Sequence, residues 1–150
     1  MIKYFEAPDI EERMKDLITV LEFDHILLDR VGCVRSRGSS ARRTIARCHG
    51  MAKILQMGMK TKPFYVIEVI SEQFDKMGDE DKVKTIIHEL MHIPKNFGGG
   101  FRHHDFVNHH NIEKMYKMYK SRTNIQINDF PSQSDSENNV DKRPRFLKFF

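Results

Sequence analysis

Two histidines and a glutamate form the motif with the most direct chemical meaning. His88, Glu89 and His92 make an H-E-x-x-H pattern within the most regular helical stretch of the chain. Positions i and i+4 lie on one face of a helix, so the two imidazoles can bind a single zinc ion. The glutamate beside the first histidine can then act as a general base toward water. The motif predicts a zinc hydrolase, a peptidase above all, with Glu89 as the catalytic residue and one Zn²⁺ as cofactor.

A catalytic zinc site needs a third protein ligand, and candidates follow the motif. His103 and His104 come directly after a glycine-rich segment that can fold the chain back toward the helix. Glu113 has 20 intervening residues after His92, which is close to the spacing of thermolysin-like enzymes. The residues themselves leave all three candidates open.

The segments before the motif alternate between helix and strand patterns. Asp9–Phe23 has apolar residues at helical spacing and predicts a first helix. His25–Leu28 and Val31–Val34 have strand character, and Thr44–Leu55 is interpreted as a strand followed by a short irregular stretch. The clearest strand is Pro63–Ile70, which is β-branched, aromatic and predicted to be central in a sheet.

Helix signals continue through and beyond the motif. Ser71–Phe74 predicts a helical turn, Asp79 is a candidate cap for the motif helix, and Pro94 should end that helix. Gly98–Gly100 is interpreted as a flexible connector to a last helix over Asp105–Arg122. The fold predicted is α+β: a minimal zincin-like domain over residues 1–123, with a small, mostly antiparallel sheet packed against the active-site helix and flanking helices.

Residues 124–150 differ from the rest in composition. Asn124–Asp141 is polar with few apolar residues, which predicts a disordered tail. The last nine residues are basic and contain Phe146, Phe149 and Phe150. Such an apolar end is costly for solubility unless a partner binds it.

Positive charge is concentrated in one part of a chain whose net charge is only +4. No acid occurs from Arg35 to Arg47, and three lysines follow before the next acid. A basic stretch of this kind either attracts nucleic acid or forms a solvated loop. The candidate DNA contacts are its five arginines: Arg35, Arg37, Arg42, Arg43 and Arg47.

The cysteines and the distribution of apolar residues indicate where in the cell the protein is located. The two cysteines, Cys33 and Cys48, form no C-x-x-C pair, which argues against a disulfide framework. No apolar run is long enough for a membrane span, and Met1–Glu6 lacks a signal-peptide pattern. A cytoplasmic protein without a membrane partner is expected.

Two segments together carry a family resemblance. His88–His92 and the later Phe101–Phe106 resemble the SprT/Spartan-like zinc metallopeptidases, and more closely a group of small predicted archaeal metallopeptidases related to them. The resemblance spans roughly residues 18–118. It implies a third zinc ligand that opens the following helix, which favours His104 over His103. It also implies an endopeptidase that acts on proteins associated with or crosslinked to DNA, with protein or peptide substrates and DNA as a partner.

The chain end carries a second resemblance. Phe146 and the pair Phe149–Phe150 are similar to a PCNA-interacting peptide, although Arg143 stands where a glutamine is usual. This similarity implies recruitment to a sliding clamp. Two alternatives remain: a general cytoplasmic metallopeptidase with no DNA role, and a non-catalytic zinc-containing module that binds nucleic acid.

Overall fold

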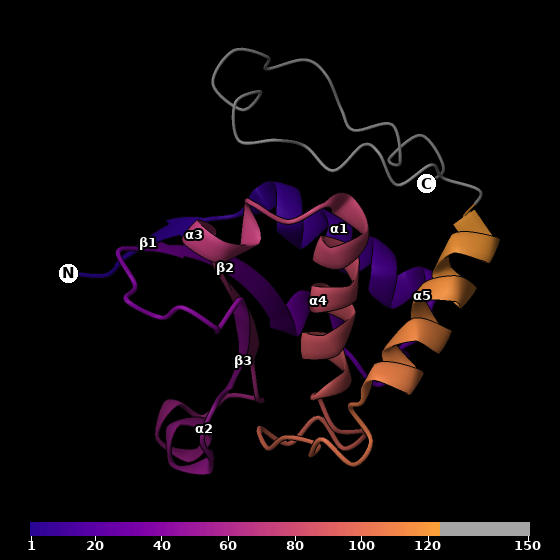
Figure 1. The fold of residues 1–150 in the computed structure, drawn as a ribbon. Helices are drawn as coiled ribbons and strands as arrows, with labels where there is room; N and C mark the ends of the chain where they lie inside the picture. The colour runs from indigo at the N-terminus through magenta and orange to yellow at the C-terminus, as the bar shows by residue number, and fades with distance from the viewer. Residues whose placement is uncertain (124–150) are drawn as a thin grey trace, which may run out of the picture.

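A computed structural model describes residues 1–123 of the chain. It has the predicted α+β architecture, a small sheet with helices packed against it (Figure 1). The elements follow in this order: β1 (Lys3–Glu6), α1 (Pro8–Val20), the 3-10 helix η1 (Leu28–Arg30), β2 (Val31–Arg37), β3 (Ala46–Gly50), α2 (Lys53–Met59), β4 (Tyr65–Ile70), α3 (Ser71–Phe74), α4 (Asp79–Met91) and α5 (His109–Thr123).

The sheet is mixed and has the strand order β1-β2-β4-β3. β2 and β4 run parallel in the middle, while β1 and β3 pair antiparallel with them at the two edges. Cys33, Ile67 and Cys48 lie side by side across the three strands β2, β4 and β3. The central position predicted for the Pro63–Ile70 strand is confirmed, and β3 is left with one edge open to other groups.

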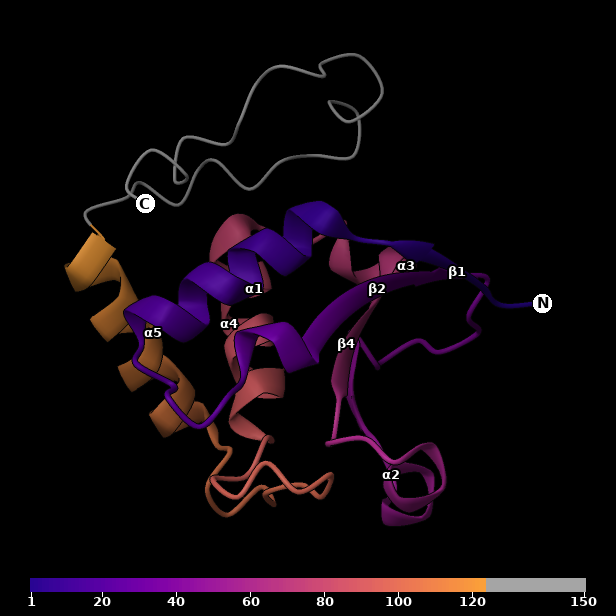
Figure 2. The same ribbon diagram turned by 180° about the vertical axis from the view of Figure 1, so that it is seen from behind.

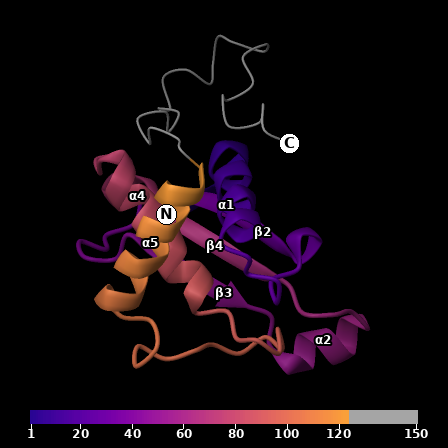
Figure 3. The same cartoon turned by 90° about the vertical axis from the view of Figure 1, so that its right-hand side faces the viewer.

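Three helices form the second layer. α1 and α4 lie against the sheet, and α5 packs on the side of α4 away from the strands (Figure 3). The helical spacing of α1 buries Ile10, Met14 and Leu17 completely. A hydrogen bond of 2.6 Å from the Tyr119 hydroxyl to the Asp16 carboxylate joins α5 to α1 within the core. These contacts fix α4, which carries the H-E-x-x-H motif, between the sheet and α5.

Two predicted segments fold differently. His25–Leu28 is a turn that leads into η1 rather than a strand. The reason is tertiary, because the His25 Nε2 atom lies 3.1 Å from the Ile93 carbonyl oxygen and Ile26 is buried. The end of Thr44–Leu55 is helical rather than irregular, since α2 begins at Lys53. Figure 2 shows α2 standing apart from the layer of long helices, near the loop that follows α4.

The helix ends also differ from the sequence prediction. Gly78 occupies the cap position of α4, so Asp79 is the first helical residue. No side-chain hydrogen bond caps this end among the described residues, and Asp79 stabilises the helix through its negative charge near the positive end of the helix dipole. α5 begins at His109, four residues later than predicted. Asn108 caps it, because its side-chain oxygen accepts a hydrogen bond of 3.0 Å from the Asn111 N–H.

No helix of the described part is long and apolar enough to cross a membrane. The terminal phenylalanines Phe146, Phe149 and Phe150 lie outside the described residues, so their predicted role stays a prediction.

Arg35 corrects part of the predicted DNA surface. Its side chain is buried on β2, and its guanidinium lies 2.8 Å from Asp9 on α1 and 2.6 Å from Asp75 after α3. Because both sides of the guanidinium are taken by carboxylates, the prediction that Arg35 contacts DNA is wrong. Its function is to join a helix and a loop to the sheet.

Replacing Arg35 should therefore destabilise the fold. We expect Arg35→Ala to lower the free energy of unfolding by about 2–3 kcal/mol, because two partly buried carboxylates lose their hydrogen-bonding partner. Urea denaturation measures this loss, and the exposed Arg42→Ala is the control, with a change within about 0.5 kcal/mol. Equal losses for the two variants would contradict the assignment of Arg35 to the fold.

Candidate metal centre

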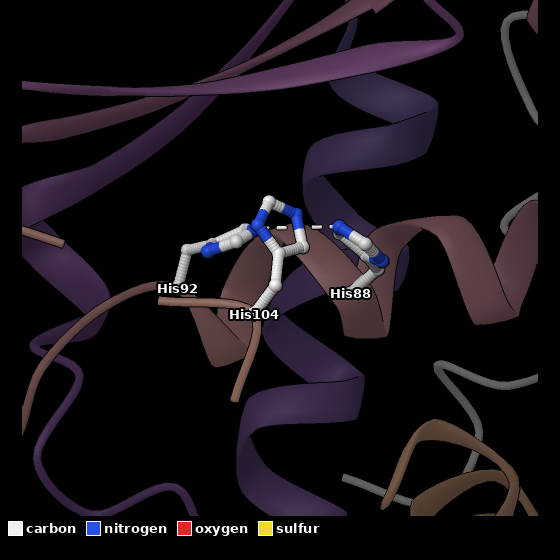
Figure 4. Close-up of side chains that lie close together, drawn as sticks. All are labelled: His88, His92 and His104. Atoms are coloured by element: carbon white, nitrogen blue, oxygen red, sulfur yellow. Dashed lines mark hydrogen bonds between the residues drawn. The ribbon is translucent and has the colours of Figure 1, made fainter. Parts of the chain in front are cut away.

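Three histidine side chains converge at the end of α4. His88 and His92 come from the motif helix, and His104 comes from the loop that returns beneath it (Figure 4). One ligand atom from each ring lies within 4.8 Å of the others. Ring centroids are 4.9 Å apart for His88 and His92 and also for His92 and His104. The structure thus brings His104 to the motif.

The spacing of the rings suits a metal ion. The Nε2 atoms of His88 and His92 lie 3.1 Å apart. Two nitrogen ligands of tetrahedral zinc, each at roughly 2.0–2.1 Å from the ion, stand about 3.3 Å apart. Three neutral imidazoles with one side left open are a donor set that zinc takes in catalytic sites. The residues present therefore fit a zinc ion.

His92 and Arg102 hold each other through two hydrogen bonds. The Arg102 N–H donates to the His92 carbonyl over 2.7 Å, and the His92 Nδ1–H donates to the Arg102 carbonyl over 2.8 Å. The second bond fixes the tautomer and leaves Nε2 free to bind a metal. The first brings the returning loop to the helix end, two residues before His104.

The glycine-rich segment is held in place rather than flexible as predicted. The Tyr65 hydroxyl on β4 donates to the Gly100 carbonyl and accepts from the Gly99 N–H, each over 2.8 Å. Gln56 on α2 donates to the Gly98 carbonyl over 3.0 Å. These bonds tie the segment to the sheet and to α2, so the approach to His104 is built on rigid elements.

Two glycines permit this contact. Gly99 has φ of +96°, a conformation that side chains disfavour, and a Cβ there would overlap the Met51 carbonyl. A Cβ on Gly50 would overlap the Gly99 carbonyl in turn. The end of β3 and the returning loop therefore touch backbone to backbone.

Glu89 lies at the open edge of β3. The residue is only 8% exposed, and the backbone N–H of Cys48 donates to its carboxylate. Burial raises the pKa of Glu89 to about 7, while this hydrogen bond opposes the rise. A carboxylate with a pKa near neutrality can both accept and release a proton, as a general base requires.

Burial has the opposite effect on His88. Burial, together with the charges of the neighbouring His92 and His104, lowers the pKa of His88 to about 4. The imidazole is therefore neutral at pH 7, which is the form that binds metal.

The other candidates for the third ligand lie elsewhere among the described residues. His103 is exposed and does not join the cluster. The Glu113 carboxylate lies 2.5 Å from the ammonium group of Lys84. The Asp105 carboxylate, one residue after His104, accepts a hydrogen bond of 2.9 Å from the Phe106 N–H.

The predicted arginines other than Arg35 are exposed. Arg42 and Arg43 lie between β2 and β3, and Arg47 lies on β3 itself. The Arg37 guanidinium is 5.4 Å from the centre of the Phe5 ring. These positions leave a DNA contact open as a prediction for the four residues.

Sequence reasoning missed the groups that position the site. The Cys48 N–H, the Arg102 carbonyl and the Tyr65 hydroxyl all act through tertiary contacts. Two of the three are backbone groups, which any residue type would supply. Of the contacts in this region, the sequence could signal the close backbone approach at Gly99, where a side chain would overlap the Met51 carbonyl.

Comparisons with known proteins agree with this chemistry. The family described as "Putative phage metallopeptidase" matches residues 2–130 of the chain. Searches of curated proteins and of solved structures found no match.

Measurements of zinc affinity can distinguish the two neighbouring histidines, His103 and His104, as the third ligand. We expect His104→Ala to weaken the affinity for zinc by at least about 100-fold, because the ion loses one of three protein ligands. His103→Ala, one residue away and exposed, is the matched control and should bind like the wild type. Competition with a chromophoric chelator measures both affinities. A larger loss for His103→Ala would place the third ligand one residue earlier.

Proposed function

The chain belongs to the phage metallopeptidase family, and on that premise we propose that it is a zinc-dependent endopeptidase. The observation that carries the proposal is the cluster of His88, His92 and His104 next to the buried carboxylate of Glu89. Histidines alone would also suit a structural metal site. A buried glutamate with a pKa near 7 is the additional group that hydrolysis requires.

Each residue has a separate role in this proposal. The three histidines would hold the ion through neutral imidazoles, with His92 oriented by the Arg102 carbonyl. Zinc bound there supplies Lewis acidity, which polarises the scissile carbonyl and makes water a better nucleophile at neutral pH. Glu89 takes a proton from the attacking water and later delivers it to the leaving amine. The Cys48 N–H keeps the carboxylate oriented for both transfers.

The open edge of β3 is a suitable place for an extended substrate. β3 pairs with β4 on one side only, and Glu89 lies at its other side next to Cys48. A peptide added along this edge would form backbone hydrogen bonds that need no particular sequence. Its scissile bond would then pass next to Glu89.

Substitution of Glu89 tests the reaction. We expect Glu89→Gln to reduce cleavage of a denatured protein at least about 100-fold, because glutamine cannot accept the proton. Zinc affinity should stay near the wild-type value, since Glu89 is not a ligand in this proposal. The control is Glu22→Gln, which removes an exposed carboxylate that lies far from Glu89 in the sequence. Equal activity of wild type and Glu89→Gln would reject the peptidase and favour a non-catalytic zinc module.

We further propose that the enzyme is SprT-like and acts on proteins associated with DNA. Support comes from the charge around the substrate edge, because no acidic residue occurs from Arg30 to Ile67. Exposed cations lie on β3 and on both sides of it along the chain: Arg42, Arg43, Arg47, Lys53, Lys60 and Lys62. A phosphate backbone bound there would hold an attached protein close to Glu89.

Charge reversal tests the DNA contact. We expect Arg42→Glu with Arg43→Glu to weaken binding to DNA about tenfold or more and to reduce its dependence on salt, because fewer counterions are released. Lys114→Glu with Lys120→Glu on α5 changes the net charge equally and is the control. Equal binding by both double variants would remove the DNA contact and leave a general metallopeptidase. Clamp recruitment through Phe146–Phe150 and a cytoplasmic location remain separate proposals.

A further inference from the structure

A cavity of about 360 Å³ opens beside the proposed catalytic residues. His88 and Glu89 form part of its lining, so it adjoins the place where a peptide bond would be cleaved. Residues from α4 and α5 make two walls, and Ile45, Ala46 and Met77 complete the lining. The volume is large enough for a long side chain.

One face of α4 leads from the reaction site into this cavity. Asp81, Lys84, Thr85 and His88 recur at i, i+3, i+4 and i+7, so they lie along the same side of the helix. Seven residues of helix separate Asp81 from His88 by roughly 10 Å along the axis. Asp81 therefore lies about the length of one extended side chain from His88, next to which the scissile bond would lie.

The polar groups in the cavity have an excess of negative charge. Lys84 is compensated twice, because its ammonium group lies 2.6 Å from the Glu80 carboxylate and 2.5 Å from that of Glu113. The same ammonium group lies 4.9 Å from the centre of the Tyr116 ring. Asp81 forms no ion pair with any residue in the part of the chain that the structure describes. A cation entering the cavity would find Asp81 available.

We infer that this cavity receives a lysine or arginine side chain from a residue that flanks the scissile bond. Ile45, Met77 and Ile112 would contact its aliphatic stem. Asp81 would bind the charged end. The inference rests on the proposed peptidase function and names its substrate class, proteins rich in lysine and arginine. Proteins that bind nucleic acid have this composition because they must neutralise phosphates.

Cleavage of a peptide library tests the inference, with the cut positions read by mass spectrometry. Wild-type enzyme should cut next to lysine or arginine at least about tenfold more often than next to leucine. Asp81→Asn should reduce this preference about tenfold, measured as the ratio of lysine or arginine cuts to leucine cuts. Asp81→Lys should shift the preference to glutamate. Asp79→Asn, in the same first turn but outside the cavity lining, is the matched control.

The outcomes separate this inference from the function on which it rests. If the enzyme cleaves peptides but Asp81→Asn leaves the ratio of lysine cuts to leucine cuts unchanged, the cavity assignment alone is overturned. A wild-type preference for glutamate would also overturn it and would identify Lys84 as the selecting group. No cleavage of any library peptide by zinc-loaded wild type would overturn both the function and the inference.

Discussion

The reciprocal pair of hydrogen bonds between His92 and Arg102 is the constraint on which the site depends. It joins the last residue of the H-E-x-x-H motif, which caps the end of α4, to a loop that is ten residues further along the chain. Without it, the loop would lose two hydrogen bonds to the end of α4 and His104 would lose this support beside the other two rings. With it, the loop returns to the helix, His104 reaches the other rings, and His92 keeps the tautomer that leaves Nε2 for the ion. A backbone contact thus completes a side-chain site.

The sheet supports this contact from the other side. Tyr65 on β4 binds the glycine segment, and the end of β3 touches it at Gly50. The same edge strand donates the Cys48 N–H to Glu89. The histidine cluster, Glu89 and the open edge of β3 are therefore positioned by neighbouring strands. Such preorganisation means that little has to rearrange when a substrate binds.

Local patterns predicted much of this fold, and tertiary contacts account for the rest. Periodicity located α1, α4 and the central strand β4, because each buries one regular set of apolar residues. It failed at His25–Leu28, whose conformation depends on Ile93 far along the chain. The basic stretch from Arg35 to Arg47 likewise predicted a surface cation at Arg35, because its two carboxylate partners lie in distant segments. For the third metal candidate, spacing left His103, His104 and Glu113 open, and only the loop geometry places His104 with the motif.

The central claim is that His88, His92 and His104 together hold one zinc ion beside Glu89. Anomalous X-ray diffraction from crystals of the zinc-loaded protein tests it most directly, because the peak marks the ion itself. We expect one zinc peak, at roughly 2.0–2.1 Å from one nitrogen of each of the three rings. A peak bound by the Glu113 carboxylate or by the His103 ring in place of His104 would contradict it.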